Sequence, residues 1–328
     1  MSGARAAKNP VGEVNGAEHV VALERRALHG HFSRDLPPVL TIERGERVRF
    51  ATLDAGWGAI AHADPFSPAP LFEPRDPRLD TGHALCGPVA IRGADPGTTL
   101  VVHVEEVRPG SWGRTVAGKV DNALNRRLGV ADGEAEVIHW AIDADAGTAR
   151  DRAGRTVRLQ PFMGVMGMPP PAPGMHSTIP PRRWGGNIDC RELVAGSTLY
   201  LPVPVPGGLF SVGDGHALQG DGEVSGLALE CPMERVVLRF DVERGELSMP
   251  RARTADGWIT FGFHEDLNEA AAIALDGMLE LMADRHGLGR KTALALASLV
   301  VSLRVTQMVN QAQGVHALLP HGVLEAAR

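Results

Sequence analysis

The sequence predicts a mainly β protein, with a sandwich-like or barrel-like β body and an α/β C-terminal part that contains one or two helices. Three observations support this fold class. The 328 residues include 39 Gly and 24 Pro, and such frequent turn-forming residues favour short strands over long helices. Six segments have the length and apolar pattern of strands. Near the C-terminus the apolar residues instead recur every three or four positions, which is the period of a helix.

The strand candidates come first along the chain. Residues 38–50 predict a hairpin, because an apolar run reaches a turn around Gly45, after which Val48 and Phe50 alternate with charged residues. The other candidates are residues 100–107, 136–142, 198–205, 224–229 and 235–242. Two segments rich in Pro and Gly, 64–87 and 161–187, are not assigned to regular structure. Long irregular loops of this kind often carry function.

The helical pattern begins at residue 267. Leu267, Ala271, Leu275 and Met278 are three or four positions apart, so a helix would place them on one face. Two glycines at 287 and 289 end this pattern. The apolar stretch that follows, residues 291–303, fits either a second helix or a helix that runs into a buried strand, and the sequence does not decide between them.

Four regions are expected from these changes in pattern. They are a flexible N-terminal tail (1–18), an N-terminal β-rich domain (19–160), a β-rich segment with the main polar motifs (161–250) and an α/β C-terminal part (251–328).

Composition excludes several classes of function. A net charge of -6 with 5% aromatic residues argues against a nucleic-acid partner, which favours basic surfaces and stacking rings. No apolar stretch approaches the roughly 20 residues of a membrane span, and the N-terminus lacks the apolar core of a secretory signal. The three cysteines include no CxxC pair and are expected to be free thiols. We therefore expect a cytoplasmic protein that acts on a small molecule.

The densest group of polar residues is the segment 211–223, SVGDGHALQGDGE. In an extended chain, residues two apart share a face, so Asp214 and His216 would project together, as would Asp221 and Glu223. The intervening glycines remove bulk and let the backbone approach a ligand. The alternative interpretation is a pair of Gly-Asp turns in which the Asp side chains bond to their own backbone.

A second polar group lies in the segment GGNIDC, where Asn187 and Asp189 are also two residues apart. One imidazole together with carboxylates suits a divalent transition metal, and zinc is the usual choice for hydrolysis. Such an ion lowers the pKa of bound water to near 7, and a neighbouring carboxylate can take the proton. A surface turn is the alternative interpretation of this segment.

Other residues are weaker candidates. His31 forms an H-x-H pair with His29, His83 lies in a Gly-rich turn, and Asp54 ends a probable strand next to a Gly-rich loop. Glu230 lies in an apolar stretch and, if buried, must be paired or protonated.

The order and spacing of several segments resemble the acetamidase/formamidase family. The segments are residues 37–45, 161–167, 179–189, 201–205, 213–223, 304–310 and 314–316, together with Asp54 and Gly87-Pro88. The joint occurrence of GGNxD and GDxHxxQGDGE is more specific than either motif alone. The resemblance covers nearly the whole chain. It implies a β-rich, sandwich-like body with an α/β C-terminal part, a homo-oligomer that is at least a dimer, and hydrolysis of a short carboxylic amide to the acid and ammonia.

We therefore expect an amide hydrolase with a divalent metal, zinc in the first instance. Asp189, Asp214 and His216 are the expected ligands, and Glu223 with His216 would move the proton. The expected substrate contacts are Asn187, His83 and Asp54. Further candidates for an additional ligand or a supporting role are His31, Asp221 and Glu230. Two alternatives remain open: a non-catalytic protein that binds a small ligand in the same fold, and a thiol-dependent hydrolase that uses Cys190, with Cys86 a second candidate nucleophile.

Overall fold

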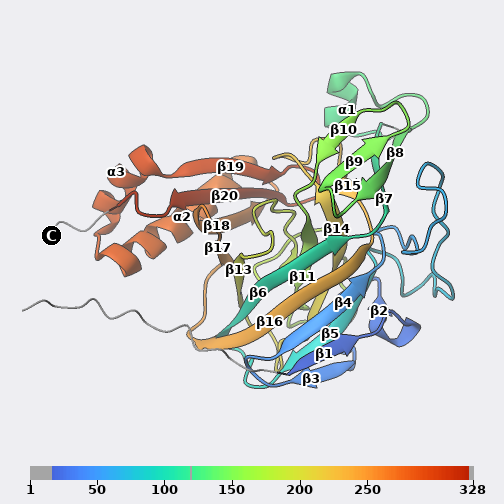
Figure 1. Cartoon of the computed structure of the whole chain (residues 1–328). Helices are drawn as coiled ribbons and strands as arrows, with labels where there is room; N and C mark the ends of the chain where they lie inside the picture. Colours follow the sequence, from blue (N-terminus) through green and yellow to red (C-terminus); the bar gives the residue numbers. More distant parts are fainter. Residues whose placement is uncertain (1–16, 119, 325–328) are drawn as a thin grey trace, which may run out of the picture.

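The computed structural model describes residues 17–118 and 120–324, and in this part of the chain strands predominate (Figure 1). The strands are β1 (Glu18–Val21), β2 (Leu28–His29), β3 (Leu40–Ile42), β4 (Arg47–Thr52), β5 (Leu85–Ile91), β6 (Thr98–Pro109), β7 (Trp112–Ala117), β8 (Glu136–Asp143), β9 (Thr148–Asp151), β10 (Thr156–Arg158), β11 (Phe162–Gly167), β12 (Gly185–Asn187), β13 (Thr198–Pro202), β14 (Phe210–Leu218), β15 (Leu229–Glu230), β16 (Met233–Arg244), β17 (Arg251–Arg253), β18 (Gly257–His264), β19 (Ser302–Gln307) and β20 (Gln313–Pro320). The helices are η1 (Arg25–Ala27, 3-10), α1 (Ala123–Leu128), α2 (Leu267–His286) and α3 (Arg290–Val300). The predicted fold class, mainly β with helices near the C-terminus, is confirmed.

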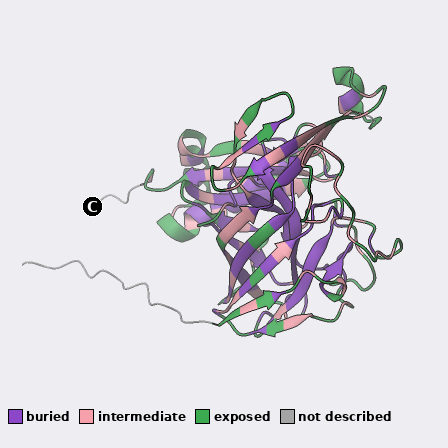
Figure 2. Ribbon diagram, turned by 45° about the vertical axis from the view of Figure 1, so that its right-hand side comes forward, coloured by how far each residue is buried: buried purple, intermediate pink, exposed green. Residues whose placement is uncertain are grey.

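Two sheets form the body. One has the strand order β1-β4-β16-β6-β13-β17-β18-β20-β19, and the other has the order β10-β9-β8-β7-β15-β14-β11-β12 with β2, β3 and β5 attached. Their inner faces meet in a shared core, where Phe210 of β14 and Phe240 of β16 pack edge to face with ring centroids 5.1 Å apart. Figure 2 shows the buried residues concentrated between the sheets.

Strand β14 is the central strand around which polar residues gather. One of its edges pairs with β11 along most of its length, and the other pairs first with β5 and then with β15. Every residue of β14 except the last is buried. Polar side chains on this strand are therefore removed from water, which is costly unless they are paired or used.

The C-terminal part contributes strands β17–β20 to one end of the nine-stranded sheet, and helices α2 and α3 pack against these strands. Asp266 caps α2 by accepting hydrogen bonds from the backbone of Asn268 and Glu269, and the helix ends at Gly287, whose φ is 65°. The predicted helix from residue 267 is therefore present. The second apolar stretch is a helix, α3, followed by strand β19, whose first two residues are exposed rather than buried.

Two strand predictions are wrong in their pairing or extent. The segments of the predicted hairpin are strands, but β3 pairs in parallel with β5, whereas β4 pairs with β1 and β16 in the other sheet. Alternation shows which side chains are buried, not which strand is the neighbour. Of the predicted strand 224–229, only Leu229 lies in a strand; Gly226 has a φ of 90° in the turn before it, and Val224 is 64% exposed.

The segment 161–187, to which the sequence assigns no regular structure, contains β11 and β12, and β5 begins at the end of the segment 64–87. All six residues of β11 are buried, so this strand lacks the alternation that would reveal it.

The four predicted regions stay a prediction. Residues 1–16 of the predicted tail lie outside the described residues, and Glu18 already belongs to β1. The nine-stranded sheet takes strands from each of the three later regions. None of the helices in the described residues has both the length and the apolar character that a membrane span requires.

Candidate active site

Four buried ionisable side chains converge at the end of β14. His216 Nε2 lies 3.3 Å from Asp214 Oδ1, its neighbour on the same face of the strand. It lies 3.2 Å from Glu230 Oε1, which is directly opposite on β15. His216 Nδ1 is 3.9 Å from Asp189 Oδ1, which comes from the loop after β12. The structure thus brings together all three residues that the sequence proposed as metal ligands, with Glu230 beside them.

Gly164 of β11 makes this convergence possible. In the β11–β14 ladder, Met163 pairs with Gly215 and Val165 pairs with Gly213, so Gly164 lies opposite Asp214. A Cβ at Gly164 would collide with the Asp214 and Asp189 carboxylates, and would come within 2.8 Å of His216 Cε1. No larger residue fits without moving these side chains.

The backbone of the site is strained at its carboxylates. Among the described residues, six that are not glycine have positive φ, and three of the six are Asp189 (52°), Asp214 (59°) and Glu223 (46°). Such conformations cost on the order of 1–3 kcal/mol each and cluster at functional sites. These strained backbone conformations direct carboxylates from three separate segments toward the same place.

Gln219 fixes the orientation of His216. Its side-chain nitrogen donates to the Asp189 backbone carbonyl at 2.7 Å, so its oxygen faces His216 Nδ1 at 3.0 Å. Because this oxygen can only accept, Nδ1 carries a proton. His216 Nε2 is therefore the nitrogen directed at Asp214 and Glu230.

The C-terminal part completes the site. The Asn310 side-chain nitrogen donates to Asp189 Oδ2. Gln307 holds the Asn310 loop, since its side-chain oxygen accepts from the Asn310 backbone at 3.0 Å. The Gly222 backbone bonds to the Thr306 carbonyl and to Met308 N, both at 3.1 Å, which fixes the neighbouring Glu223.

The ionisation of these groups is strongly perturbed. Burial, together with the charges of Glu223 and Asp214, raises the pKa of Asp189 well above its usual value. Burial opposes ionisation of Asp214, but the charges of His216 and His83 outweigh it and lower the Asp214 pKa. Burial also raises the pKa of Glu223 to about 8. Carboxyls with opposite shifts in one site are typical of acid–base machinery.

Burial disfavours the charged form of His216, yet the adjacent carboxylates of Glu230 and Asp214 raise its pKa. The same negative charges attract a metal cation, and a proton and a cation compete for the same nitrogen atom.

Several buried polar atoms in this site have no hydrogen-bond partner. They are Asp189 Oδ1, His216 Nε2, Glu223 Oε2 and Glu230 Oε2. Asn187 Oδ1, on β12 two residues before Asp189, is a further buried atom without a partner. Buried polar atoms are normally satisfied, so a concentration of orphans indicates a missing ligand. Two groups, Asp214-His216-Glu230 and Asp189-His216-Glu223, each offer three ligand atoms within 4.8 Å of one another. The donor set therefore fits a divalent cation.

Two further predicted residues, Asp54 and His83, act on the converging side chains through their charges. Asp54 is buried, contacts Arg114 at 3.2 Å, and its charge contributes to the raised pKa of Glu230, for which burial is the main cause. His83 Nδ1 contacts the Thr178 hydroxyl at 2.9 Å, and its charge reaches Asp214.

Two predicted residues are turned elsewhere. The contacts of His31 are the Leu79 carbonyl and the ring of His29, not the four converging side chains. Asp221 is exposed and pairs with Arg304 at 2.6 Å. The expectation that it shares a face with Glu223 is wrong, because the chain is not extended there and Gly222 has a φ of 90°.

A cavity of about 270 Å³ lies next to the site. Gln219 and Glu223 form part of its wall, and most of the remaining surface is apolar. The apolar side chains are those of Trp140, Val157, Leu218, Val224, Leu227, Ala228 and Leu229.

Sequence reasoning assigned no role to Gly164, Gln219 and Asn310. All three lie in segments that carry the family resemblance, and this resemblance is the one feature of the sequence that could have indicated them. Their roles depend on contacts between distant parts of the chain, so no local pattern reveals them.

Comparison with known proteins gives consistent matches. The sequence model of the Acetamidase/Formamidase family matches residues 16–177 and 172–256. The crystal structure of an acetamidase from Yersinia enterocolitica is 27% identical, with a TM-score of 0.81, over 95% of this chain and 94% of that chain.

Two curated relatives also match. A predicted formamidase of Schizosaccharomyces pombe is 28% identical over 62% of this chain and 61% of its own length. A formamidase of Methylophilus methylotrophus is 25% identical over 60% of each chain. The matched region thus spans about three fifths of these relatives.

Proposed function

The chain belongs to the acetamidase/formamidase family, and we propose that it hydrolyses a short carboxylic amide to the carboxylate and ammonia. The observation that carries this proposal is the group of buried, unpaired polar atoms around Gly164, which come from four separate segments of the chain. Its relatives include a formamidase and an acetamidase, names that agree with this chemistry.

Asp214, His216 and Glu230 would hold a divalent cation, for which zinc fits one imidazole and carboxylates. When bound, such an ion supplies a Lewis acid and lowers the pKa of water. This assignment places Glu230 among the ligands. Asp189 instead belongs to the group Asp189-His216-Glu223, and the Asn310 side chain donates a hydrogen bond to its carboxylate.

The proton would be moved by Glu223. Its pKa of about 8 keeps the carboxyl protonated at neutral pH. Ammonia is a poor leaving group until its nitrogen receives a proton, which this carboxyl can donate. The nearby Asp189, whose pKa is also raised, can share the proton with Glu223, as paired carboxyls do.

Asn187 would orient the substrate. Its unpaired side-chain oxygen is buried and can only accept a hydrogen bond. A primary amide supplies two N–H donors, so the amide nitrogen of the substrate satisfies this atom. The apolar wall of the adjoining cavity suits the hydrocarbon side of the same amide.

The thiol route has little physical support. Cys190 is buried and donates a hydrogen bond to Glu192 Oε2 at 3.2 Å. Burial and the Glu192 charge raise its pKa, whereas a nucleophilic thiol needs a lowered pKa. Location in the cytoplasm and assembly as a homo-oligomer are further parts of this proposal.

Ammonia release from formamide, acetamide, butyramide and benzamide tests the function directly. We expect release that stops on treatment with a chelator, and the variants Asp214→Asn and Glu230→Gln should lose the metal of this centre together with turnover. Binding of amides without ammonia release would indicate a binding protein instead. Inhibition by a thiol reagent alone would favour Cys190.

A further inference from the structure

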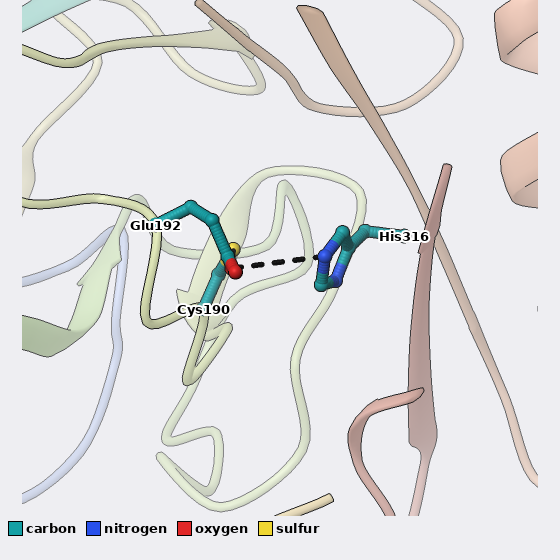
Figure 3. A group of neighbouring side chains, drawn as sticks. All are labelled: Cys190, Glu192 and His316. Carbon is teal, nitrogen blue, oxygen red and sulfur yellow. Dashed lines mark hydrogen bonds and ion pairs between the residues drawn. The ribbon is translucent and has the colours of Figure 1, made fainter. Parts of the chain in front are cut away.

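A second group of potential metal ligands lies outside the proposed catalytic centre. Figure 3 shows Cys190 and Glu192, from the loop after β12, facing His316 of β20. All three side chains are buried, with relative exposures of 0%, 7% and 0%. The proposed catalytic function uses none of them.

The distances within this group match a tetrahedral zinc site. Cys190 Sγ lies 3.2 Å from Glu192 Oε2, which lies 3.6 Å from His316 Nε2. The three ligand atoms are all within 4.8 Å of one another. With bonds of about 2.0 Å to oxygen and nitrogen and about 2.3 Å to sulfur, tetrahedral geometry separates such ligands by about 3.3–3.5 Å.

His316 provides an independent sign of a ligand. Its Nε2 atom is buried and has no hydrogen-bond partner, since 3.6 Å to Glu192 is too long for one. The other ring nitrogen, Nδ1, contacts the Thr306 hydroxyl at 2.8 Å. With a proton on Nδ1, Nε2 directs a lone pair at Glu192 and Cys190, which is how a histidine ligand is usually held.

The two oxygens of the Glu192 carboxylate have different neighbours because Arg304 contacts only one of them. Its Nη1 contacts Glu192 Oε1 at 2.6 Å, which leaves Oε2 to face Cys190 and His316. Arg304 also pairs with Asp221. A divalent cation with the Cys190 thiolate would bring the summed charge of these groups to zero, which favours binding in a buried place.

We propose that Cys190, Glu192 and His316 bind a second divalent cation of the zinc class, with a structural role. The ion would fasten the loop that carries Asp189 to the β19–β20 hairpin that carries Asn310. It would thereby hold together the two parts of the chain that meet at the catalytic centre. Three protein ligands leave a fourth position for water.

Cobalt substitution tests this site by a signal that the catalytic centre cannot give. Cobalt(II) bound to a thiolate has a charge-transfer absorption band in the near ultraviolet, and no cysteine belongs to the Asp214-His216-Glu230 group. We expect this band in the wild-type protein and in Asp214→Asn and Cys231→Ser. It should be absent from Cys190→Ser and greatly weakened in His316→Gln.

Metal analysis of zinc-loaded protein separates this proposal from the catalytic one. Cys190→Ser should lose one equivalent of zinc per chain, and Asp214→Asn should lose the other. A loss in Cys190→Ser alone would support the second site and refute the catalytic metal. Unchanged zinc in both Cys190→Ser and His316→Gln, without a cobalt–thiolate band, would overturn the second site.

A measurement on the wild-type protein covers the case in which these variants do not fold. X-ray absorption at the zinc edge should detect a sulfur neighbour at about 2.3 Å. A spectrum that contains only nitrogen and oxygen neighbours would refute the proposal.

Discussion

The Asn310 side chain donates a hydrogen bond to the Asp189 carboxylate across 121 positions of the sequence. Asn310 belongs to the loop between β19 and β20, so the C-terminal part contributes directly to the site formed by β11, β14 and β15. Substitution of a residue that hydrogen-bonds to a reacting group, without itself contacting the substrate, commonly changes activity by about 10–100-fold.

Replacement of Asn310 by Ala should therefore lower turnover by about 10–100-fold while the fold is retained. The physical reason is that Asp189 loses the donor that orients its carboxylate. Steady-state ammonia release and the thermal midpoint measure the two effects. Gln311→Asn is a matched control, because residue 311 is exposed and Asn tolerates its positive φ. Equal rates for Asn310→Ala and this control would show that Asn310 is only a loop residue.

Glu223→Gln should reduce turnover by about 10²–10⁴-fold, the usual contribution of a general acid or base. Its size and burial are preserved, so stability should change little. Glu265→Gln, the same substitution at an exposed glutamate to which no role is assigned, is the control. Full activity in Glu223→Gln would remove this residue from the proton-transfer role.

The pH profile gives a second test of Glu223. Burial raises the pKa of this carboxyl to about 8, so the protonated form is present below that pH and is lost above it. Wild-type turnover should accordingly fall as the pH rises through about 8. The residual activity of Glu223→Gln should lack this fall, because the amide does not titrate. A wild-type profile that stays flat to pH 10 would contradict the assignment.

Gly164→Ala should abolish turnover and metal binding at the catalytic centre, because the added methyl group occupies the place where the Asp189 and Asp214 carboxylates meet His216. Gly164 does not have positive φ, so the backbone itself accepts Ala. Gly289→Ala, where an added Cβ meets nothing within 4 Å, is the control. Metal analysis and ammonia release provide the readouts. Normal metal content in Gly164→Ala would show that the carboxylates can move apart without loss.

The sequence predicts the β body, the helix from residue 267 and the polar residues of β14, because each leaves a local signal. Asp214 and His216 are two apart in a strand, and this period alone places them on one face. The sequence does not predict strand partners, since β3 and β4 join different sheets despite a turn-like link. Strand β11 also escapes detection, because it is buried on both faces.

The parts of the site that the sequence leaves open depend on tertiary contacts. Glu230 appears as an isolated charge in an apolar stretch, and only its pairing with β14 places it opposite His216. Asp221 and Glu223 have the spacing of a shared face, but the backbone turns between them at Gly222. Spacing therefore predicts a shared face only where the chain is extended.

His29 should make the fold sensitive to acid. It is buried in β2, where Nδ1 lies 2.7 Å from the His31 carbonyl and Nε2 lies 3.0 Å from the Ser211 hydroxyl. Burial lowers its pKa from 6.5 to about 4. Below pH 6.5 the unfolded chain therefore binds a proton that the folded chain does not, and stability falls as the pH decreases towards 4.

Between pH 7 and pH 5 this difference amounts to about 2 kcal/mol of unfolding free energy. His29→Asn should be less stable than the wild type at pH 7 but should lose less of its stability on acidification, because its side chain does not titrate. Urea denaturation at the two pH values measures both slopes, with exposed His264→Asn as the control that keeps the wild-type slope. Parallel slopes for wild type and His29→Asn would show that the pKa of His29 is the same in the folded and unfolded chains, which would contradict a pKa lowered by burial.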